Sequence, residues 1–262
     1  MKMLSLPTTL KTALIATALV AAPNVFAQTY IGVSGGISLK NDSKNKGTFT
    51  GAVPATTVAP LYPAIPSGTT LGWTTEFDKG LNVNAQIGHR FEGGLRVEGE
   101  VSYTRNGVKT HRGVSVGGAN IDAVDASVLT RGALVGSSVG AVVNSGIGKT
   151  NSLGLFANAF YDFNSAGKFQ PYLGAGAGLS RNKVDYRPSN IDVGQGKQTK
   201  FAYQLTAGAT YKISDNFELF GQYRFRDNGK TKVALDLLPA DLKVEGKQSI
   251  FALGLRIPFG GN

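Results

Sequence analysis

The sequence predicts an all-β protein: an eight-stranded antiparallel up-and-down transmembrane β-barrel with short periplasmic turns and long extracellular loops. Three observations carry this prediction. Apolar and polar side chains alternate over segments of about 10 residues, the length that a tilted membrane strand needs. Short and long connections join these segments in the manner of outer-membrane barrels. The chain also begins with a segment that has the features of an export signal.

Residues 1–27 have the composition of a cleaved signal peptide. Lys2 and Lys11 form a basic region before an apolar run at 12–22, and Val25 and Ala27 stand at the spacing of a cleavage site. The apolar run is shorter than the roughly 20 residues that span a bilayer. An N-terminal membrane anchor is the alternative, but no stop-transfer pattern follows it. The expected barrel domain is therefore 28–262, and the expected location is the outer membrane.

Composition limits the kinds of site that the chain can hold. The formal net charge is +10, and there is no cysteine, so disulfides and thiol nucleophiles are excluded. A basic balance suggests nucleic acid or an anionic surface as a partner. Because export argues against nucleic acid, outer-membrane lipid, lipopolysaccharide or another polysaccharide is the expected anionic partner. No cofactor is expected.

Eight segments show the alternation, and they justify the strands in chain order. Within 95–103 the apolar side chains are odd-numbered, and the same separation recurs in 201–213, 217–225 and 251–259. Successive side chains of a strand point to opposite faces, so each strand has one apolar and one polar face. The predicted strands are 29–39, 81–91, 95–104, 152–163, 169–180, 201–213, 216–226 and 248–259. The short connections are 92–94, 164–168 and 214–215, and the long ones are 40–80, 105–151, 181–200 and 227–247.

Aromatic side chains favour a membrane barrel over a soluble β-sandwich, which also shows alternation. Strands of soluble sheets usually have about 5 or 6 residues, and a sandwich gives no reason for aromatics to collect at strand ends. Here they fall into two bands, as interface girdles do. The predicted periplasmic band is Phe91, Phe163, Tyr211, Phe217 and Phe259, and the predicted outer band is Tyr103, Phe201, Tyr203 and Phe225.

The polar face is predicted to fill the barrel with charge. The interior of an eight-stranded barrel is just wide enough to be filled by side chains. Charges there have to be paired, because isolated buried ions are costly. Glu98 and Glu100 are expected to pair across the lumen with arginines from the set Arg224, Arg226 and Arg256. The expected interior charge network is Arg90, Arg96, Glu98, Glu100, Asp162, Glu218, Arg224, Arg226 and Arg256.

One strand departs from the simple pattern. In 152–163, Phe156 and Phe160 point inward if the leucines of that strand face lipid. The neighbouring strand would then have to present the glycines between 174 and 178 to the interior, which leaves room for the two rings. We therefore predict that these phenylalanines and glycines pair.

The second half of the chain resembles a known family. Residues 158–163 (NAFYDF), 171–178 (PYLGAGAG) and the strand–turn–strand at 201–225 are similar to the OmpA-like and opacity-type surface antigens, porin-family small barrels of Gram-negative bacteria. The similarity extends over 151–259 and more loosely over 28–103. It implies an outer-membrane barrel with a structural, adhesive or weakly pore-forming role.

The C-terminal strand ends on a second family feature. Residues 254–259 (GLRIPF) resemble the aromatic signal through which the barrel-assembly machinery recognises such chains. Residues 260–262 follow the aromatic here, whereas the family usually ends on it.

Three functions remain open from the sequence: a surface protein with a charge-plugged interior, a narrow ion or solute channel, and a small-barrel hydrolase. Catalysis would need a histidine. His89 is expected to face lipid, while His111 is expected to be a solvated loop residue, with Asp122 and Asp125 on the same loop as possible partners. Two separated histidines without cysteine predict no metal site. Residues 148–150 lack the context of a phosphate-binding loop.

Any adhesive or receptor role is expected in the connections 40–80 and 105–151, since loops carry function on a rigid scaffold. Residues 51–70, rich in Pro, Thr and Ala, predict a flexible or hairpin extension. In the second connection, Asn120 is positioned to cap a short helix over 121–129.

Overall fold

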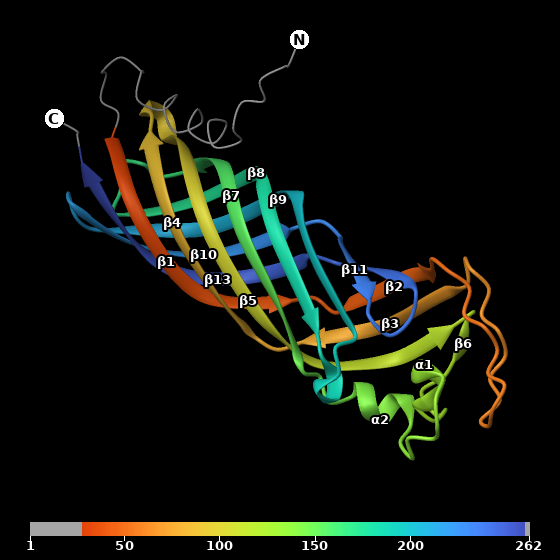
Figure 1. Ribbon diagram of the computed structural model, residues 1–262. Helices are drawn as coiled ribbons and strands as arrows, with labels where there is room; N and C mark the ends of the chain where they lie inside the picture. Colours follow the sequence, from red (N-terminus) through yellow and green to blue (C-terminus); the bar gives the residue numbers. More distant parts are fainter. Residues whose placement is uncertain (1–27, 260–262) are drawn as a thin grey trace, which may run out of the picture.

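The computed structural model describes residues 28–259 as one antiparallel sheet of 13 strands that is wrapped into a barrel (Figure 1). The predicted signal peptide at 1–27 and the last residues, 260–262, lie outside the described residues. None of the helices within 28–259 is long and apolar enough to cross a membrane.

The strands vary from short bridges to long ribbons that run the length of the molecule. They are β1 (Gln28–Lys40), β2 (Ser43–Phe49), β3 (Thr70–Phe77), β4 (Gly80–Arg90), β5 (Leu95–Val116), β6 (Ala119–Asn120), β7 (Gly148–Asp162), β8 (Phe169–Tyr186), β9 (Gly194–Ser214), β10 (Phe217–Asp227), β11 (Thr231–Leu235), β12 (Ala240–Val244) and β13 (Lys247–Phe259). The helices are η3 (Glu92–Gly94), α1 (Ser127–Thr130), α2 (Val139–Val143) and η4 (Pro188–Asn190).

Pairing closes the sheet at the end where Gln28 and Phe259 lie. There β1 lies between β4 and β13, and the ring continues through β5, β7, β8, β9 and β10 back to β13. Each of these strands overlaps one of the predicted strands. The short connections expected at 92–94, 164–168 and 214–215 join their ends, and η3 forms the first of them.

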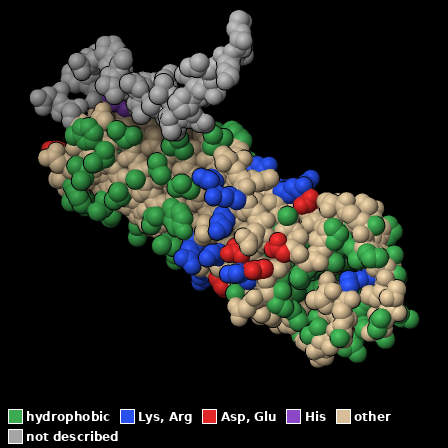
Figure 2. All heavy atoms as spheres, viewed as in Figure 1, with side chains coloured by type: hydrophobic (Ala, Val, Ile, Leu, Met, Phe, Trp, Pro, Cys, Tyr) green, Lys and Arg blue, Asp and Glu red, His purple; other side chains and the backbone are tan. Residues whose placement is uncertain are grey.

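The apolar face of this ring points outward. Ile31 and Val33 on β1 are 49% and 59% exposed, while Ser34 between the same neighbours is buried. On β13, Leu253 is 68% exposed and Ala252 is 4% exposed. Figure 2 shows hydrophobic side chains covering this end of the molecule. A soluble sandwich would bury its apolar side chains. Here the apolar side chains point outward and the polar ones inward, as in a barrel that faces lipid.

The sequence predicts long loops for the four long connections, and this prediction is wrong. Large parts of these connections form strands that continue the sheet. We call the band of exposed apolar side chains around the ring the apolar belt. Strands β5, β8 and β9 run past this belt, and β2, β3, β11 and β12 complete the wall of the barrel beyond it. The reason is that backbone N–H and C=O groups outside the membrane still gain partners in a ladder. We call this part the distal extension; it consists of 43–77, 107–150, 184–196 and 229–246.

The distal extension has an apolar core, which the lipid-facing part of the barrel does not. Trp73 on β3, Val108 on β5 and Leu242 on β12 are among its buried members, and α2 contributes Val139. Here the period-2 pattern has its ordinary sense, with apolar side chains inside. The side chains that point inward therefore change from charged to apolar along the length of the barrel.

The predicted helix over 121–129 is wrong. Only Ser127–Thr130 is helical, as α1, and the Asn120 side chain accepts from the amide of Asp122 at 2.9 Å in a local turn. Asp122 in turn accepts from the amides of Gly113 and Val114. Such side-chain bonds to the backbone compete with helix formation.

The tip of the molecule is formed by two connections held together. Val53 and Ile65 exchange two backbone hydrogen bonds of 2.8 Å, so the segment 51–70 contains a hairpin. Arg131, next to α1, donates to the carbonyl oxygens of three residues in that hairpin, two of them at 2.7 and 2.9 Å. The first long connection is therefore tied to the second.

The pairing of inward phenylalanines with glycines is confirmed. Phe156 lies opposite Gly178 and Phe160 opposite Gly174 in the β7–β8 register, and both rings are buried inside the barrel. A Cβ at Gly174 would lie 2.1 Å from the Phe160 ring. The glycines of β8 thus provide the space that the rings of β7 occupy.

Candidate functional site

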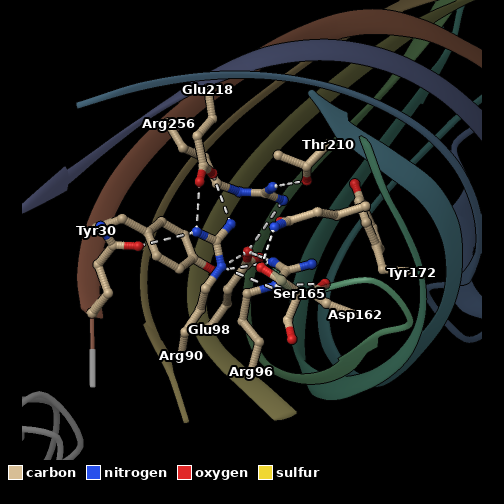
Figure 3. Close-up of polar contacts among 12 residues, drawn as sticks. Tyr30, Arg90, Arg96, Glu98, Asp162, Ser165, Tyr172, Thr210, Glu218 and Arg256 are labelled. Carbon is tan, nitrogen blue, oxygen red and sulfur yellow. Dashed lines mark hydrogen bonds and ion pairs between the residues drawn. The ribbon is translucent and has the colours of Figure 1, made fainter. Parts of the chain in front are cut away.

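The interior of the lipid-facing part of the barrel collects most of the buried charges of residues 28–259. All nine residues of the predicted network point inward, because they share the even-numbered side of their strands, and all except Arg90 are nearly inaccessible to solvent. The structure brings them together in two adjoining clusters, one around Glu98 at the Gln28 end of the barrel and one around Glu100 above it. Figure 3 shows most of the first cluster.

In the first cluster two arginines face three carboxylates. Arg90 forms a two-point contact with Glu218, at 2.6 and 2.7 Å. Arg96 donates its Nε to Asp162 at 3.1 Å and its Nη1 to Glu98. Two-point contacts of this kind are among the stronger ion pairs in proteins.

Arg256 and Tyr30 complete the first cluster from β13 and β1. Arg256 Nη2 lies 3.5 Å from Glu98, and its Nη1 donates to the hydroxyl of Thr210 at 2.7 Å. The Tyr30 hydroxyl donates to Glu98 and accepts from Arg96 at 3.0 Å. Glu98 thus receives hydrogen bonds or ion pairs from three separate strands.

In the second cluster one carboxylate holds two arginines. Arg224 Nη1 and Arg226 Nη2 each lie 2.8 Å from the same oxygen of Glu100. Arg226 also donates to Ser102 at 2.7 Å and to Gln204 at 2.8 Å. Glu98 and Glu100 both lie on β5, and their arginine partners on β10 and β13 reach them across the lumen, because neither of those strands pairs with β5 in the sheet.

Aromatic rings pack against the guanidinium groups and separate the charges from one another. Such contacts are favourable and strengthen where water is excluded. The closest pairs are Arg96 over Phe160 at 4.3 Å, Arg226 over Phe156 at 4.3 Å and Arg256 over Phe220 at 4.0 Å.

Sequence reasoning missed three residues of this site: Tyr30, Tyr172 and Phe220. They are fully buried and contact the arginines, whereas the sequence pattern led us to expect only Phe156 and Phe160 among the aromatics inside the barrel. Their even numbers place them on the inward side of their strands. That parity is the signal that could have identified them.

Above the two clusters, mostly polar side chains surround a cavity of about 10 Å³, no larger than one water molecule needs. Beyond this cavity lies the apolar core of the distal extension. Within 28–259, charged, polar and apolar side chains thus follow one another along the lumen.

The prediction of a solvated His111 is wrong. Its ring is 3% exposed and packs edge-on against Tyr186, with centroids 4.8 Å apart, and near Trp73 at 6.1 Å. Its Nδ1 lies 2.8 Å from the hydroxyl oxygen of Thr75. Burial lowers the pKa of His111 to about 4. The odd–even pattern of β5 would not have placed His111 inside, because the register against β3 shifts between Val108 and Thr110 and turns this odd-numbered residue inward.

The two aspartates considered as partners of His111 bind backbone instead. Asp125 accepts from the amides of Ser127, Val135 and Gly136, and the Val135 bond is the first cause of an Asp125 pKa lowered to about 2. No histidine–carboxylate pair suited to general-base chemistry therefore forms at this position. Within 28–259, no group of three His, Cys, Asp or Glu side chains could hold a metal ion.

The predicted girdle residues lie at the two ends of the apolar belt. At the end where Gln28 lies, Phe163 and Tyr211 are 58% and 50% exposed; at the other end, Phe201 is 65% exposed. His89 packs against Phe91 with ring centroids 4.8 Å apart, at the Gln28 end. The nine are Phe91, Tyr103, Phe163, Phe201, Tyr203, Tyr211, Phe217, Phe225 and Phe259, of which Phe217 and Phe225 are half-buried.

With this geometry in view, comparison with known proteins decides the family. The family described as "outer membrane protein beta-barrel domain" matches residues 12–257. The chain belongs to this family. The resemblance inferred from the sequence is thereby confirmed, and the chain is an outer membrane β-barrel protein of the Gram-negative type.

Two curated relatives of this outer membrane β-barrel protein match part of its length. It is 31% identical to outer membrane protein PagN of Salmonella typhimurium over 84 residues, which is 29% of this chain and 34% of that protein. It is 33% identical to a candidate adhesin of Rickettsia bellii over 104 residues, which is 37% of this chain and 46% of that protein. The chain thus matches less than half the length of either relative.

A solved structure supports the fold. The crystal structure of the outer membrane protein OprG from Pseudomonas aeruginosa matches with a TM-score of 0.56 at 12% identity, and the match covers 89% of this chain and 97% of that one. At this identity the likeness concerns the fold alone.

Proposed function

We propose that this outer membrane β-barrel protein is a surface protein that binds through its distal extension, with the charged interior acting as a structural plug. The observation that carries the proposal is the change of interior along the barrel. Paired charges fill the lipid-facing part, and an apolar core fills the extension. Such a filled, rigid barrel is suited to presenting a surface away from the membrane.

The strands proposed to cross the membrane are the eight of the closed ring: β1, β4, β5, β7, β8, β9, β10 and β13. Their outward side chains form the apolar belt, and the short turns between them would lie in the periplasm. An even number returns both ends of the domain to that side. We further propose that 1–27 is a cleaved signal peptide, that 28–262 is the mature domain, and that β13 is recognised by the barrel-assembly machinery.

The binding surface is proposed at the tip, where the hairpin in 51–70 meets the segment around α1. Val58 and Leu61 are 77% and 73% exposed there, and Leu134 and Val135 are 67% and 54% exposed. Exposed apolar groups of this kind frequently mark contact sites. The name of the Rickettsia relative, a candidate adhesin, points to a ligand on a host or environmental surface.

An enzymatic role is not proposed. A small-barrel hydrolase needs a general base or nucleophile in an accessible place. His111 is buried and its Nε2 has no hydrogen-bond partner, which leaves it no carboxylate to orient it. Neither relative named above carries the name of an enzyme.

Replacement of the tip tests the proposal. We expect that exchanging residues 54–64 for a short Gly-Ser turn abolishes attachment of expressing cells to the surfaces they bind, while the barrel keeps its heat-dependent electrophoretic shift. The matched control exchanges the periplasmic turn 164–168 for a turn of equal length and keeps attachment. Unchanged attachment after the tip exchange, with equal surface expression, would contradict the proposal.

A further inference from the structure

Four basic side chains lie on the outward face of the barrel where the apolar belt ends. Arg105 on β5, Arg181 and Lys183 on β8, and Lys197 on β9 are all exposed. The strand register makes them neighbours: Arg105 is opposite Asn151, Asn151 is opposite Lys183, and Lys183 is opposite Lys197. We call these four cations the basic border patch.

The patch lies at the level of the lipid headgroups. Leu179 is 57% exposed in the apolar belt, and Arg181 and Lys183 follow it by two and four residues on the same strand. Phe201, 65% exposed, stands four residues from Lys197. A strand rises about 3.3 Å per residue, so with a tilt of about 40° the charges lie roughly 5–10 Å beyond the belt. That is the headgroup layer.

The patch has no acidic partner. Within 28–259, no carboxylate forms an ion pair with any of its four side chains, although several exposed cations farther out are paired. Lys109 and Arg112 both pair with Glu76, and Lys230 pairs with Glu245. The positive charge of the patch is therefore left uncompensated by the protein.

Two of the cations face each other directly. Like charges opposite one another on neighbouring strands are destabilising, so the pair Lys183 and Lys197 favours an anion between them. The distal extension contains a similar exposed pair, Lys46 and Lys243. Lys243, on β12, stands eight residues before Phe251 of the belt, which lies on β13; with the same rise and tilt this is roughly 20 Å beyond the belt, outside the headgroup layer. Position as well as charge therefore distinguishes the patch.

We infer that the basic border patch binds the phosphate groups of the outer-leaflet glycolipid, lipopolysaccharide. Guanidinium and ammonium groups are the usual protein partners of phosphate, and basic groups beside a membrane are attracted to anionic headgroups. Asn151 and Thr199, which lie between the cations, add neutral donors. Figure 2 shows basic side chains gathered between the apolar end and the distal extension. The inference rests on the proposed membrane-crossing strands but not on adhesion.

The test compares two matched double variants of the full-length barrel. K183Q/K197Q removes the border pair, and K46Q/K243Q removes an equally exposed, like-charged pair outside the headgroup layer. The probe is diphosphoryl lipid A in nonionic detergent micelles, with dephosphorylated lipid A as the negative control. Relative to the wild type, we expect the affinity for diphosphoryl lipid A to be about tenfold or more lower in K183Q/K197Q. In K46Q/K243Q it should differ by less than about twofold. Amide NMR shifts on binding should cluster at Arg105, Asn151, 181–183 and 197–199.

Several results would overturn the inference. Equal losses in both variants would indicate a general effect of net charge, and equal binding of dephosphorylated lipid A would remove phosphate from the recognition. Tighter binding of a soluble sulfated polysaccharide at the same amides would assign the patch to a different ligand. If K183Q/K197Q fails to fold, R105Q/R181Q serves in the same assay. The tip exchange at 54–64 should leave lipid A binding intact, so failure of one proposal is distinguishable from failure of the other.

Discussion

At the scale of single residues, Glu100 holds the most demanding position in the barrel. It accepts from Arg224 and Arg226, and both guanidinium groups are almost fully buried. Removal of one partner from a buried pair leaves a charge without compensation, which costs about 3–5 kcal/mol. Glu100 has two such partners to satisfy, so its loss affects both.

We therefore expect Glu100→Gln to lower the free energy of unfolding by about 3 kcal/mol or more. Guanidinium-induced unfolding of the barrel in lipid vesicles measures this. Glu92→Gln, in the exposed turn η3, is the control and should change stability by less than about 0.5 kcal/mol. If Glu100→Gln were as stable as Glu92→Gln, the ion pairs of Glu100 would not contribute to the stability of the barrel. E100Q/R226Q should be less destabilised than the sum of its two single variants.

His111 lies beside Trp73 inside the distal extension, with the two ring centroids 6.1 Å apart. The pKa of His111 is lowered by burial from 6.5 to about 4. Between these values the unfolded segment binds a proton that the folded one does not. The stability of the distal extension therefore falls as the pH drops from 6.5 toward 4, and the loss is complete below the folded pKa.

The chain's one tryptophan makes this measurable. We expect the fluorescence of Trp73 to change in acid with a midpoint no higher than 6.5, and close to 4 if the extension stays folded. His111→Gln should abolish the transition. A transition that persists unchanged in that variant would mean that another group titrates beside the indole.

At the scale of elements, the two connections at the tip act as one unit because of Arg131. Its guanidinium donates to the carbonyl oxygens of Pro54, Tyr62 and Pro63, and Tyr62 also contacts Ser127 at 2.7 Å. We expect Arg131→Ala to release the hairpin and to make residues 54–63 at least several-fold more susceptible to limited proteolysis. Arg112→Ala, an exposed change elsewhere in the extension, should leave the cleavage rate as it is. Equal rates in both variants would contradict the tie.

The element scale also shows what the sequence could and could not predict. The membrane strands were predictable because lipid fixes both their length and the side on which apolar residues stand. Trp73, Val108 and Leu242 obey the same period of two, but their apolar side points inward. A pattern with apolar side chains on the outward side therefore identifies strands only as far as the apolar belt. The strands beyond the belt, whose apolar side chains point inward, are mistaken for loops.

Hydrogen bonds to other segments explain why no helix forms over 121–129. The period of three to four residues over 121–129 is compatible with a helix, but Asp122 and Asp125 bind backbone amides of other segments. Those contacts are set by tertiary structure, which the sequence pattern does not show. By contrast, the interior charges were identifiable from parity alone, because an ion on the lipid side would cost about 2 to 4 kcal/mol at mid-membrane.

At the scale of the whole molecule, the barrel contains two consecutive barriers to solute. The clusters around Glu98 and Glu100 fill the lipid-facing part, and the core that includes Trp73 and Leu242 closes the extension. The cavity between them has a volume of about 10 Å³. A change in one barrier leaves the other in place, because different strands and different kinds of side chain build them.

This leads to a prediction about conductance. We expect purified protein in planar bilayers to show no steady single-channel current, and we expect Glu98→Ala to show none either, since the apolar core still blocks the path beyond the vacated space. A porin of known conductance, reconstituted under the same conditions, controls for insertion. Steady current in the wild type would favour the channel function, whereas current that appears only in Glu98→Ala would show that the charged network is the sole barrier. Silence in both variants, with folded protein in the bilayer, is the behaviour expected of a scaffold.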